Sequence, residues 1–207
     1  MTRGVLLVVC VTAFACSKAA PPPAPAALAA PVAAAAASGA TGSIAGQVKA
    51  TGSAVVVLEP KTARTFAAPD EKPVMDQAGL SFGPELLLVR TGFPVEFRNS
   101  DDTLHNVRVS HEETRASAFN VAIPTGESYT YTFEKDGFYR VGCDIHPAMA
   151  ASVFAASSPF AMIAGADGRF AFADVPPGAW TVTVYVDGKQ LHKDVEVASG
   201  PVTVAIE

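Results

Sequence analysis

Short segments rich in β-branched and aromatic residues, separated by Gly, Asp and Pro at close intervals, most constrain the fold of this 207-residue chain. Examples are residues 54–58, 94–97, 129–133 and 181–186. Few windows show the apolar period of a helix. Strands of this length with turn residues between them are typical of antiparallel sandwiches. We therefore expect an all-β protein.

The first sixteen residues predict export. Arg3 precedes an apolar run of twelve residues, Gly4 to Ala15, which is too short to span a bilayer because a spanning helix needs about 20 residues. The small residues before Cys16 resemble the lipobox of bacterial lipoproteins, in which the cysteine is lipidated. We expect residues 1–16 to be a lipoprotein signal peptide with its lipidated Cys16; ordinary cleavage to a soluble periplasmic protein is the alternative. In the resembling lipoproteins, a Ser after the cysteine, here Ser17, implies sorting to the outer membrane.

Residues 17–42 are expected to form a linker. From Ala19 to Ala40 the chain contains only Ala, Pro, Ser, Gly, Val and Leu, with no charge to solvate and no pattern that could bury a core. Proline-rich segments favour extended polyproline geometry at about 3.1 Å per residue, so this segment could hold a folded region roughly 60–70 Å from a membrane.

The net charge and the cysteines of the exported chain limit the classes of partner it could bind and the roles that Cys143 could have. Without Arg3, 14 basic residues remain against 20 acidic residues, a net charge of −6, which does not favour nucleic acid or an anionic membrane surface. We expect membrane contact through the lipid anchor only. Cys143 is the one cysteine after Cys16, so it has no partner within the mature chain. A bound metal would keep this sulfur occupied as a thiolate, although a buried, inert cysteine is the alternative.

Four residues have the chemistry of a copper site. Cys143, His146 and Met149 follow one another at three-residue steps, and His105 lies thirty-eight residues before Cys143. One thiolate, two imidazoles and a weak axial thioether form the ligand set that holds copper for electron transfer. A core role is the alternative for His105, and core packing is the alternative for Met149. We expect one type 1 copper ion bound by these four side chains.

The region from 72 to 156 resembles a cupredoxin domain. The resemblance is carried by the ligand strand Gly137-Phe-Tyr-Arg-Val-Gly-Cys143, the His105-Asn106-Val107 tripeptide and the pieces 82–84, 89–92 and 95–99. The short Cys-x2-His-x2-Met loop is similar to that of amicyanin and shorter than that of plastocyanin. The two-residue strand period places Tyr139, Val141 and Cys143 on one face. The resemblance implies a Greek-key β-sandwich in which Asn106 ties the two ligand loops together by hydrogen bonds.

The flanking residues resemble a second, smaller β-sandwich of the carboxypeptidase regulatory-like family. Residues 166–187 carry a Gly turn, two aromatic strand positions and Pro-Pro-Gly before a long strand, and residues 42–48 read Gly-x-Ile-x-Gly-x-Val. Fewer than 50 residues remain after Ser158, too few for a comfortable core. We therefore expect residues 43–60 and 158–207 to form one split sandwich, with the cupredoxin domain inserted into it or packed beside it. The combination is similar to methylamine utilization-type cupredoxin proteins.

These features favour a one-electron carrier in the periplasm, lipid-anchored at the outer membrane, with a redox partner protein there. The chain has no Cys-x-x-Cys-His haem motif and no Gly-rich phosphate loop, so we do not expect an enzyme. A copper-binding or storage lipoprotein is the main alternative, and a structural protein with a relic site is another.

Four further residues receive ordinary roles: Met75 and Met162 are predicted to lie in the core, and His111 and His192 at the solvated surface. The acidic pairs Asp101-Asp102 and Glu112-Glu113 are read as a solvated charged face that could edge a docking surface.

Overall fold

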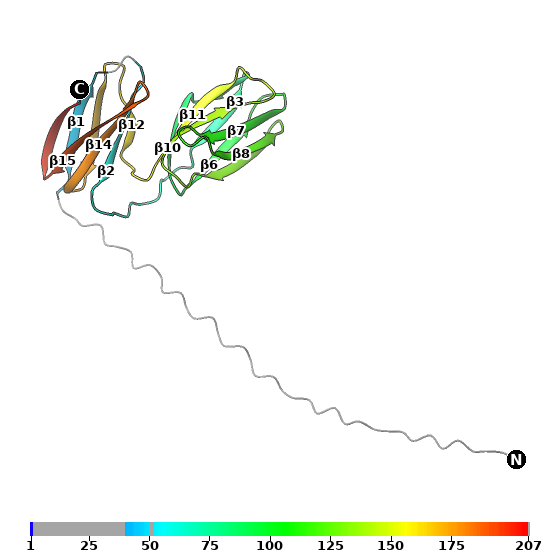
Figure 1. Ribbon diagram of the computed structural model, residues 1–207, viewed down its shortest axis with the longest axis horizontal. Coiled ribbons are helices and arrows are strands. Elements are labelled where there is room, and N and C mark those ends of the chain that lie inside the picture. The colour runs from blue at the N-terminus through cyan, green and yellow to red at the C-terminus, as the bar shows by residue number, and fades with distance from the viewer. Residues whose placement is uncertain (2–39, 50–51, 207) are drawn as a thin grey trace. The chain divides into compact units, whose positions relative to one another are not determined.

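A computed structural model describes Met1, residues 40–49 and residues 52–206. Within those residues all regular structure is β, in sixteen strands (Figure 1). The all-β expectation is therefore confirmed. The signal segment, Cys16 and most of the predicted linker lie outside the described residues. In the part of the chain that is described, no helix has the length and apolarity needed to cross a membrane.

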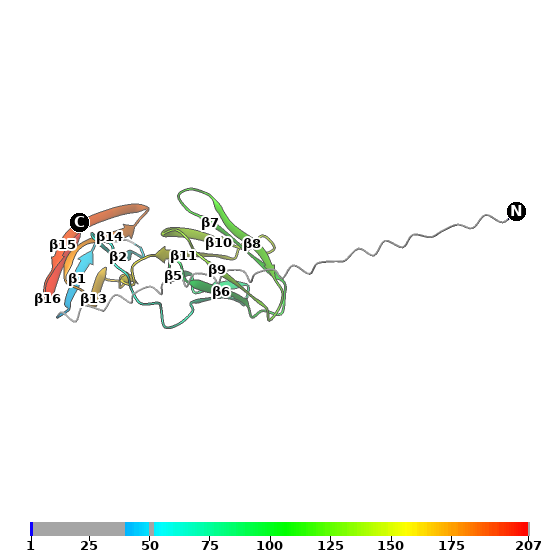
Figure 2. The ribbon, with the colours of Figure 1, turned by 90° about the horizontal axis from the view of Figure 1, so that it is seen from below.

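The first sandwich combines strands from both ends of the described chain. One sheet has the order β13 (Arg169–Val175), β1 (Gly42–Val48), β16 (Gly200–Ile206), and the other has the order β12 (Ala161–Ile163), β2 (Val55–Pro60), β14 (Gly178–Val186), β15 (Lys189–Val197). β1 pairs antiparallel with β13 and parallel with β16, which lie together in Figure 2. β2 pairs antiparallel with β14, opposing Val56 to Val184. The early strands therefore depend for their partners on residues more than a hundred positions later.

Close packing explains two glycines of β1. A Cβ atom on Gly46 would collide with the backbone oxygen of Val204 and with the ring of Phe170, and one on Gly42 would collide with the backbone oxygen of Ala198. Only glycine lets the neighbouring strand and the aromatic ring approach this closely. The Gly-x-x-x-Gly spacing of residues 42–46 is thus a packing requirement of this sheet.

The apolar run of β2 is buried on both of its faces. Val56 and Leu58 pack into the core of the first sandwich with Trp180, whereas Val55 and Val57 pack with Phe154 of β11 (Ala150–Ala156) in a separate apolar cluster. A strand that is covered on both faces reads as a continuous apolar run instead of an alternating one.

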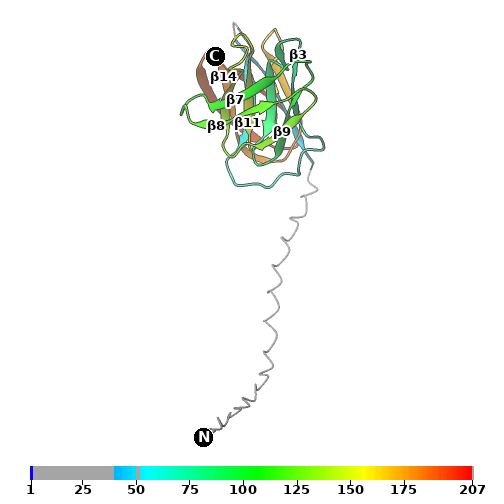
Figure 3. The same cartoon turned by 90° about the vertical axis from the view of Figure 1, so that its right-hand side faces the viewer.

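The second sandwich holds the residues between β2 and β12. Its five-stranded sheet has the order β5 (Leu86–Arg90), β11, β10 (Gly137–Gly142), β7 (His105–His111), β8 (Ser117–Ile123), and its four-stranded sheet has the order β4 (Ser81–Gly83), β3 (Val74–Ala78), β6 (Pro94–Asn99), β9 (Ser128–Thr132). Figure 3 shows β7, β8, β9 and β11 of this sandwich. Its core contains Met75, Phe97, Phe133 and Val141, all at most 3% exposed. Tyr139, Val141 and Cys143 are all buried, as the two-residue period of the ligand strand predicts.

The structure corrects the prediction for one histidine. His111 is buried at 8% exposure, and its ring packs edge-on against Tyr139 with centroids 4.9 Å apart. Its Nδ1 accepts the backbone N–H of Thr114 at 3.3 Å. The polar sequence around it belongs to an exposed turn that begins after the strand, so the ring itself still faces β10. His192 is exposed, Met75 is fully buried and Met162 is partly buried against the first core, as expected.

Candidate metal centre

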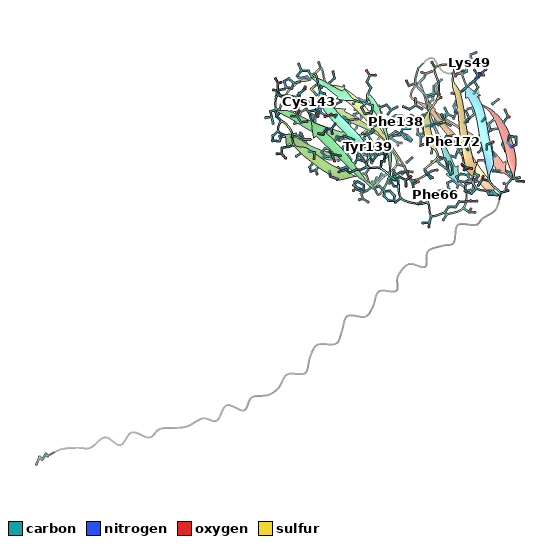
Figure 4. The ribbon with its side chains drawn as sticks, turned by 180° about the vertical axis from the view of Figure 1, so that it is seen from behind. Lys49, Phe66, Phe138, Tyr139, Cys143 and Phe172 are labelled. Carbon is teal, nitrogen blue, oxygen red and sulfur yellow. The ribbon has the colours of Figure 1, made fainter. Side chains whose placement is uncertain are left out.

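Strand pairing brings the two ligand segments together. β7 and β10 are antiparallel neighbours, with Gly142 opposite Arg108, so the residues after β10 meet the start of β7. The turn from Cys143 to Met149 joins β10 to β11 and is closed by a hydrogen bond from the N–H of Met149 to the carbonyl of His146, 2.9 Å. Figure 4 labels Cys143, which directly follows β10, and Phe138 and Tyr139, which lie near the start of that strand. One turn and one strand start therefore supply every predicted ligand.

Three donor atoms of the predicted ligand set converge. Cys143 Sγ lies 3.9 Å from His105 Nδ1 and 4.0 Å from His146 Nδ1, and the two Nδ1 atoms are 3.0 Å apart. The point in their plane that is equidistant from all three lies about 2.1 Å from each, close to ordinary metal–nitrogen and metal–sulfur bond lengths of about 2.0–2.3 Å. Soft sulfur with two imidazoles suits copper, so the donor set fits the predicted ion in both spacing and chemistry.

The ring of His105 is held in a fixed orientation. Its Nε2 lies 2.8 Å from Asp101 Oδ2 and can donate only there, so its Nδ1, 3.9 Å from Cys143 Sγ, is the ring nitrogen that can offer a lone pair to a metal. Asp101 in turn accepts the backbone N–H groups of Gly79 at 2.6 Å and Leu80 at 3.0 Å. Hydrogen bonds from Leu80 and then from His105 hold the pKa of Asp101 below its ordinary value. Sequence reasoning placed Asp101 only at the protein surface and missed this contact, which depends on a distant turn.

Asn106 connects the ligand turn to β7. Its Oδ1 accepts the backbone N–H groups of Asp144 at 2.6 Å and Ile145 at 3.2 Å, and lies 3.4 Å from Cys143 Sγ. Its Nδ2 donates to Asn120 Oδ1 at 2.8 Å and to Asp144 Oδ2 at 3.2 Å. The side chain, at 7% residue exposure, therefore uses both ends of its amide to fix the turn.

The carboxylate of Asp144, the residue after Cys143, also accepts hydrogen bonds from side chains. Arg108 Nε donates to Asp144 Oδ1 at 2.7 Å, and Asn120 Nδ2 donates to Asp144 Oδ2 at 3.0 Å. Arg108 first, and Asn120 second, hold the pKa of Asp144 below its ordinary value, so it is ionised at neutral pH.

The predicted ligands differ in how far they are exposed to solvent. Met149 is 2% exposed and packs in the same apolar cluster as Cys143. His105 is fully buried, whereas His146 is half-buried and is followed by the exposed Pro147 and Ala148. Leu104 at 48% exposure and Ile145 at 47% exposure directly precede the two histidines. These apolar side chains, together with Pro147 and Ala148, form what we call the apolar rim.

Part of the chain is similar to known copper proteins. Residues 70–155 match the family model for copper binding proteins of the plastocyanin/azurin family. Similar solved structures include a reduced amicyanin variant, 24% identical over 48% of this chain and 98% of its own with a TM-score of 0.38. They also include a Cu(I) amicyanin variant, 23% identical over 48% of this chain and 98% of its own with a TM-score of 0.38. The Cu-containing nitrite reductase of Thermus scotoductus SA-01 is 28% identical over 47% of this chain and 25% of its own, with a TM-score of 0.38. No curated protein matches the sequence. Residues 70–155 are therefore similar to the copper binding proteins of the plastocyanin/azurin family.

Proposed function

We propose that this chain is a one-electron carrier whose cupredoxin domain binds a single type 1 copper ion through His105, Cys143, His146 and Met149. The observation that carries the proposal is the convergence of three donor atoms around a point about 2.1 Å from each. Copper at this point would supply a Cu(II)/Cu(I) couple. No catalytic role is proposed for any residue of the chain.

Hydrogen bonds outside the ligand set favour electron transfer over simple metal capture. Asp101 fixes the ring of His105, and Asn106 fixes the turn that carries Cys143 and His146. Ligands that are held by the protein change position little between the two oxidation states, which keeps the reorganisation small. A storage protein needs no such orientation of its ligands.

The surface around His146 is the proposed route for the electron. Of the two histidines only His146 is partly exposed, and three residues of the apolar rim, Ile145, Pro147 and Ala148, flank it in the sequence. Apolar side chains at a contact are desolvated at little cost, so they let a partner approach closely. The partner is proposed to be a redox protein of the periplasm that docks on this rim.

The proposed location follows from the start of the sequence. A short basic and apolar signal, small residues before Cys16 and Ser17 after it support a lipoprotein of the outer membrane that faces the periplasm. Cys143, the one cysteine after the lipidated Cys16, suits this compartment when copper occupies its thiolate.

The test is a charge in the apolar rim. Ala148→Glu should retain copper and its colour but slow electron self-exchange by about tenfold or more, because the docking of two molecules would bring two carboxylates together; tenfold corresponds to about 1.4 kcal/mol. Ala171→Glu, at an exposed position of β13 in the other sandwich, should leave the rate unchanged. Equal rates in a coloured Ala148→Glu variant and the wild type would remove the rim from the mechanism. A wild-type protein that binds copper but does not cycle reversibly between its oxidation states would favour storage.

A further inference from the structure

The residue after the predicted thiolate ligand carries a charge that the ligand set does not use. Asp144 is bound by side chains of two other strands: Arg108 of β7 reaches Oδ1 at 2.7 Å, and Asn120 of β8 reaches Oδ2 at 3.0 Å. Asn106 reaches the same Oδ2 at 3.2 Å. Both carboxylate oxygens are therefore held within hydrogen-bond distance of a side chain, one step along the chain from Cys143.

This arrangement fixes which way the amide of Asn106 points. Asp144 Oδ2 accepts only, and Asn120 offers Asn106 its Oδ1 because its own Nδ2 donates to Asp144. Both acceptors require the NH2 end of Asn106, so Asn106 Oδ1 must face the ligand turn. If the amide were reversed, Asn106 Oδ1 would lie against two other oxygens, Asn120 Oδ1 and Asp144 Oδ2. The backbone N–H groups of Asp144 and Ile145 would then have no acceptor. Asp144 thus acts on the ligand turn through Asn106.

The backbone leaves space for the cation that balances this charge. Arg108 lies opposite Gly142 in the strand register, one residue before Cys143. A Cβ atom at Gly142 would stand 3.3 Å from Arg108 Nη2, tighter than ordinary contact. A glycine at this position lets the guanidinium lie along β10 and reach Asp144.

A carboxylate beside the thiolate would favour the oxidised ion, since an added negative charge stabilises Cu(II) relative to Cu(I). Arg108, 2.7 Å from Asp144 Oδ1, opposes that effect with a positive charge. The pair is half exposed, with side-chain exposures of 50% and 48%, so it contributes little to folding stability. Its effect should therefore appear at the metal and in the ligand turn more than in the overall stability.

We propose that Asp144, Arg108 and Asn120 form a positioning network that orients Asn106 and balances the charge beside Cys143, and thereby sets the reduction potential of the bound copper. This inference rests on the proposed function. Asp144 and Arg108 are positioning residues, because neither supplies a donor atom to the site.

The experiment is a double-mutant cycle with the full copper-loaded protein. Asp144→Asn should raise the potential and Arg108→Gln should lower it, each by the equivalent of about threefold to tenfold in the Cu(II)/Cu(I) ratio, where tenfold is about 59 mV for one electron. In the double variant, the Cu(II)/Cu(I) ratio should return to within about twofold of the wild-type ratio. A matched control is Arg140→Gln, because Arg140 also lies on this sheet and pairs with Glu112 at 2.7 Å with similar exposure. It should leave the potential unchanged.

The metal-free protein gives a second readout, which does not depend on copper. Hydrogen exchange of the backbone amides of residues 144 and 145, relative to their intrinsic rates, should accelerate about tenfold or more in Asp144→Ala and stay unchanged in Arg140→Gln, since only the former loses the group that orients Asn106. The charge-balancing role would be overturned if both single variants shifted the potential in the same direction. It would also be overturned if each changed the Cu(II)/Cu(I) ratio by less than threefold. Unchanged exchange in Asp144→Ala would overturn the positioning role. A wild type without a reversible copper couple would instead reject the proposed function.

Discussion

Replacement of Asn106 by alanine should weaken the fold even before copper is added. Alanine keeps Cβ but removes the Oδ1 that accepts the N–H groups of Asp144 and Ile145. A buried donor left without a partner costs about 1–3 kcal/mol, and water reaches this turn in part. Two such donors give an expected loss of about 2–4 kcal/mol. The Nδ2 bonds add little, because the exposed Asn120 and Asp144 can turn to solvent.

The assay is urea and thermal unfolding of metal-free Asn106→Ala beside the wild type. For a folded part of this size, each kcal/mol lowers Tm by about 2–4 °C, so the expected decrease is roughly 4–16 °C. Gln47→Ala is the control: Gln47 is exposed on the other sandwich and makes one side-chain bond, to the carbonyl of Asp167, so its loss should be at most about 0.5 kcal/mol.

The copper site should weaken in the same variant. Removal of a group that orients metal ligands costs typically 10–100-fold in metal affinity. A metal-free Asn106→Ala protein with a stability within about 0.5 kcal/mol of the wild type would show that the turn does not depend on this side chain. The account of a preformed ligand geometry would then be wrong.

Three other changes test separate parts of the account. Asp101→Asn removes a negative charge from the partner of His105, so the copper potential should rise; an unchanged potential would contradict the role of this hydrogen bond. Deletion of residues 43–60 removes β2, which pairs with the strand of Trp180, and most of β1, which packs in the same core; Trp180 is 0% exposed, so its fluorescence should shift to longer wavelength, and unchanged emission would indicate an independent C-terminal module. Cys16→Ala should move the protein from the membrane fraction or block its maturation, whereas a wild type found wholly in the soluble periplasm would reject lipidation.

Local patterns in the sequence were sufficient to predict the all-β class and several of the strands. The segments 54–58, 94–97, 129–133 and 181–186 all overlap strands, because β-branched residues between turn signals leave few other structures. The ligand run after β10 was also readable, since three of the four predicted ligands lie on one turn. The resemblance of the split sandwich to the carboxypeptidase regulatory-like family stays a prediction, although β1 and β2 do pair with strands of the C-terminal part.

The rest could not be predicted because it depends on contacts between distant segments. Asp101 meets His105 only because the turn at Gly79 and Leu80, both with positive φ, presents two N–H groups to its carboxylate. The Arg108–Asp144 pair requires the register between β7 and β10. His111 looked solvated because its sequence neighbours are acidic, whereas its burial is decided by Tyr139 on another strand.

The most direct test of the central claim is the visible and EPR spectrum of the purified protein loaded with Cu(II). Charge transfer from the Cys143 thiolate to copper should give an intense red absorption and an EPR signal with narrow copper hyperfine splitting, both lost in Cys143→Ser. His192→Ala, at an exposed position outside the site, should keep both. A colourless copper-loaded wild type with an ordinary tetragonal EPR signal would contradict the assignment of a type 1 copper site.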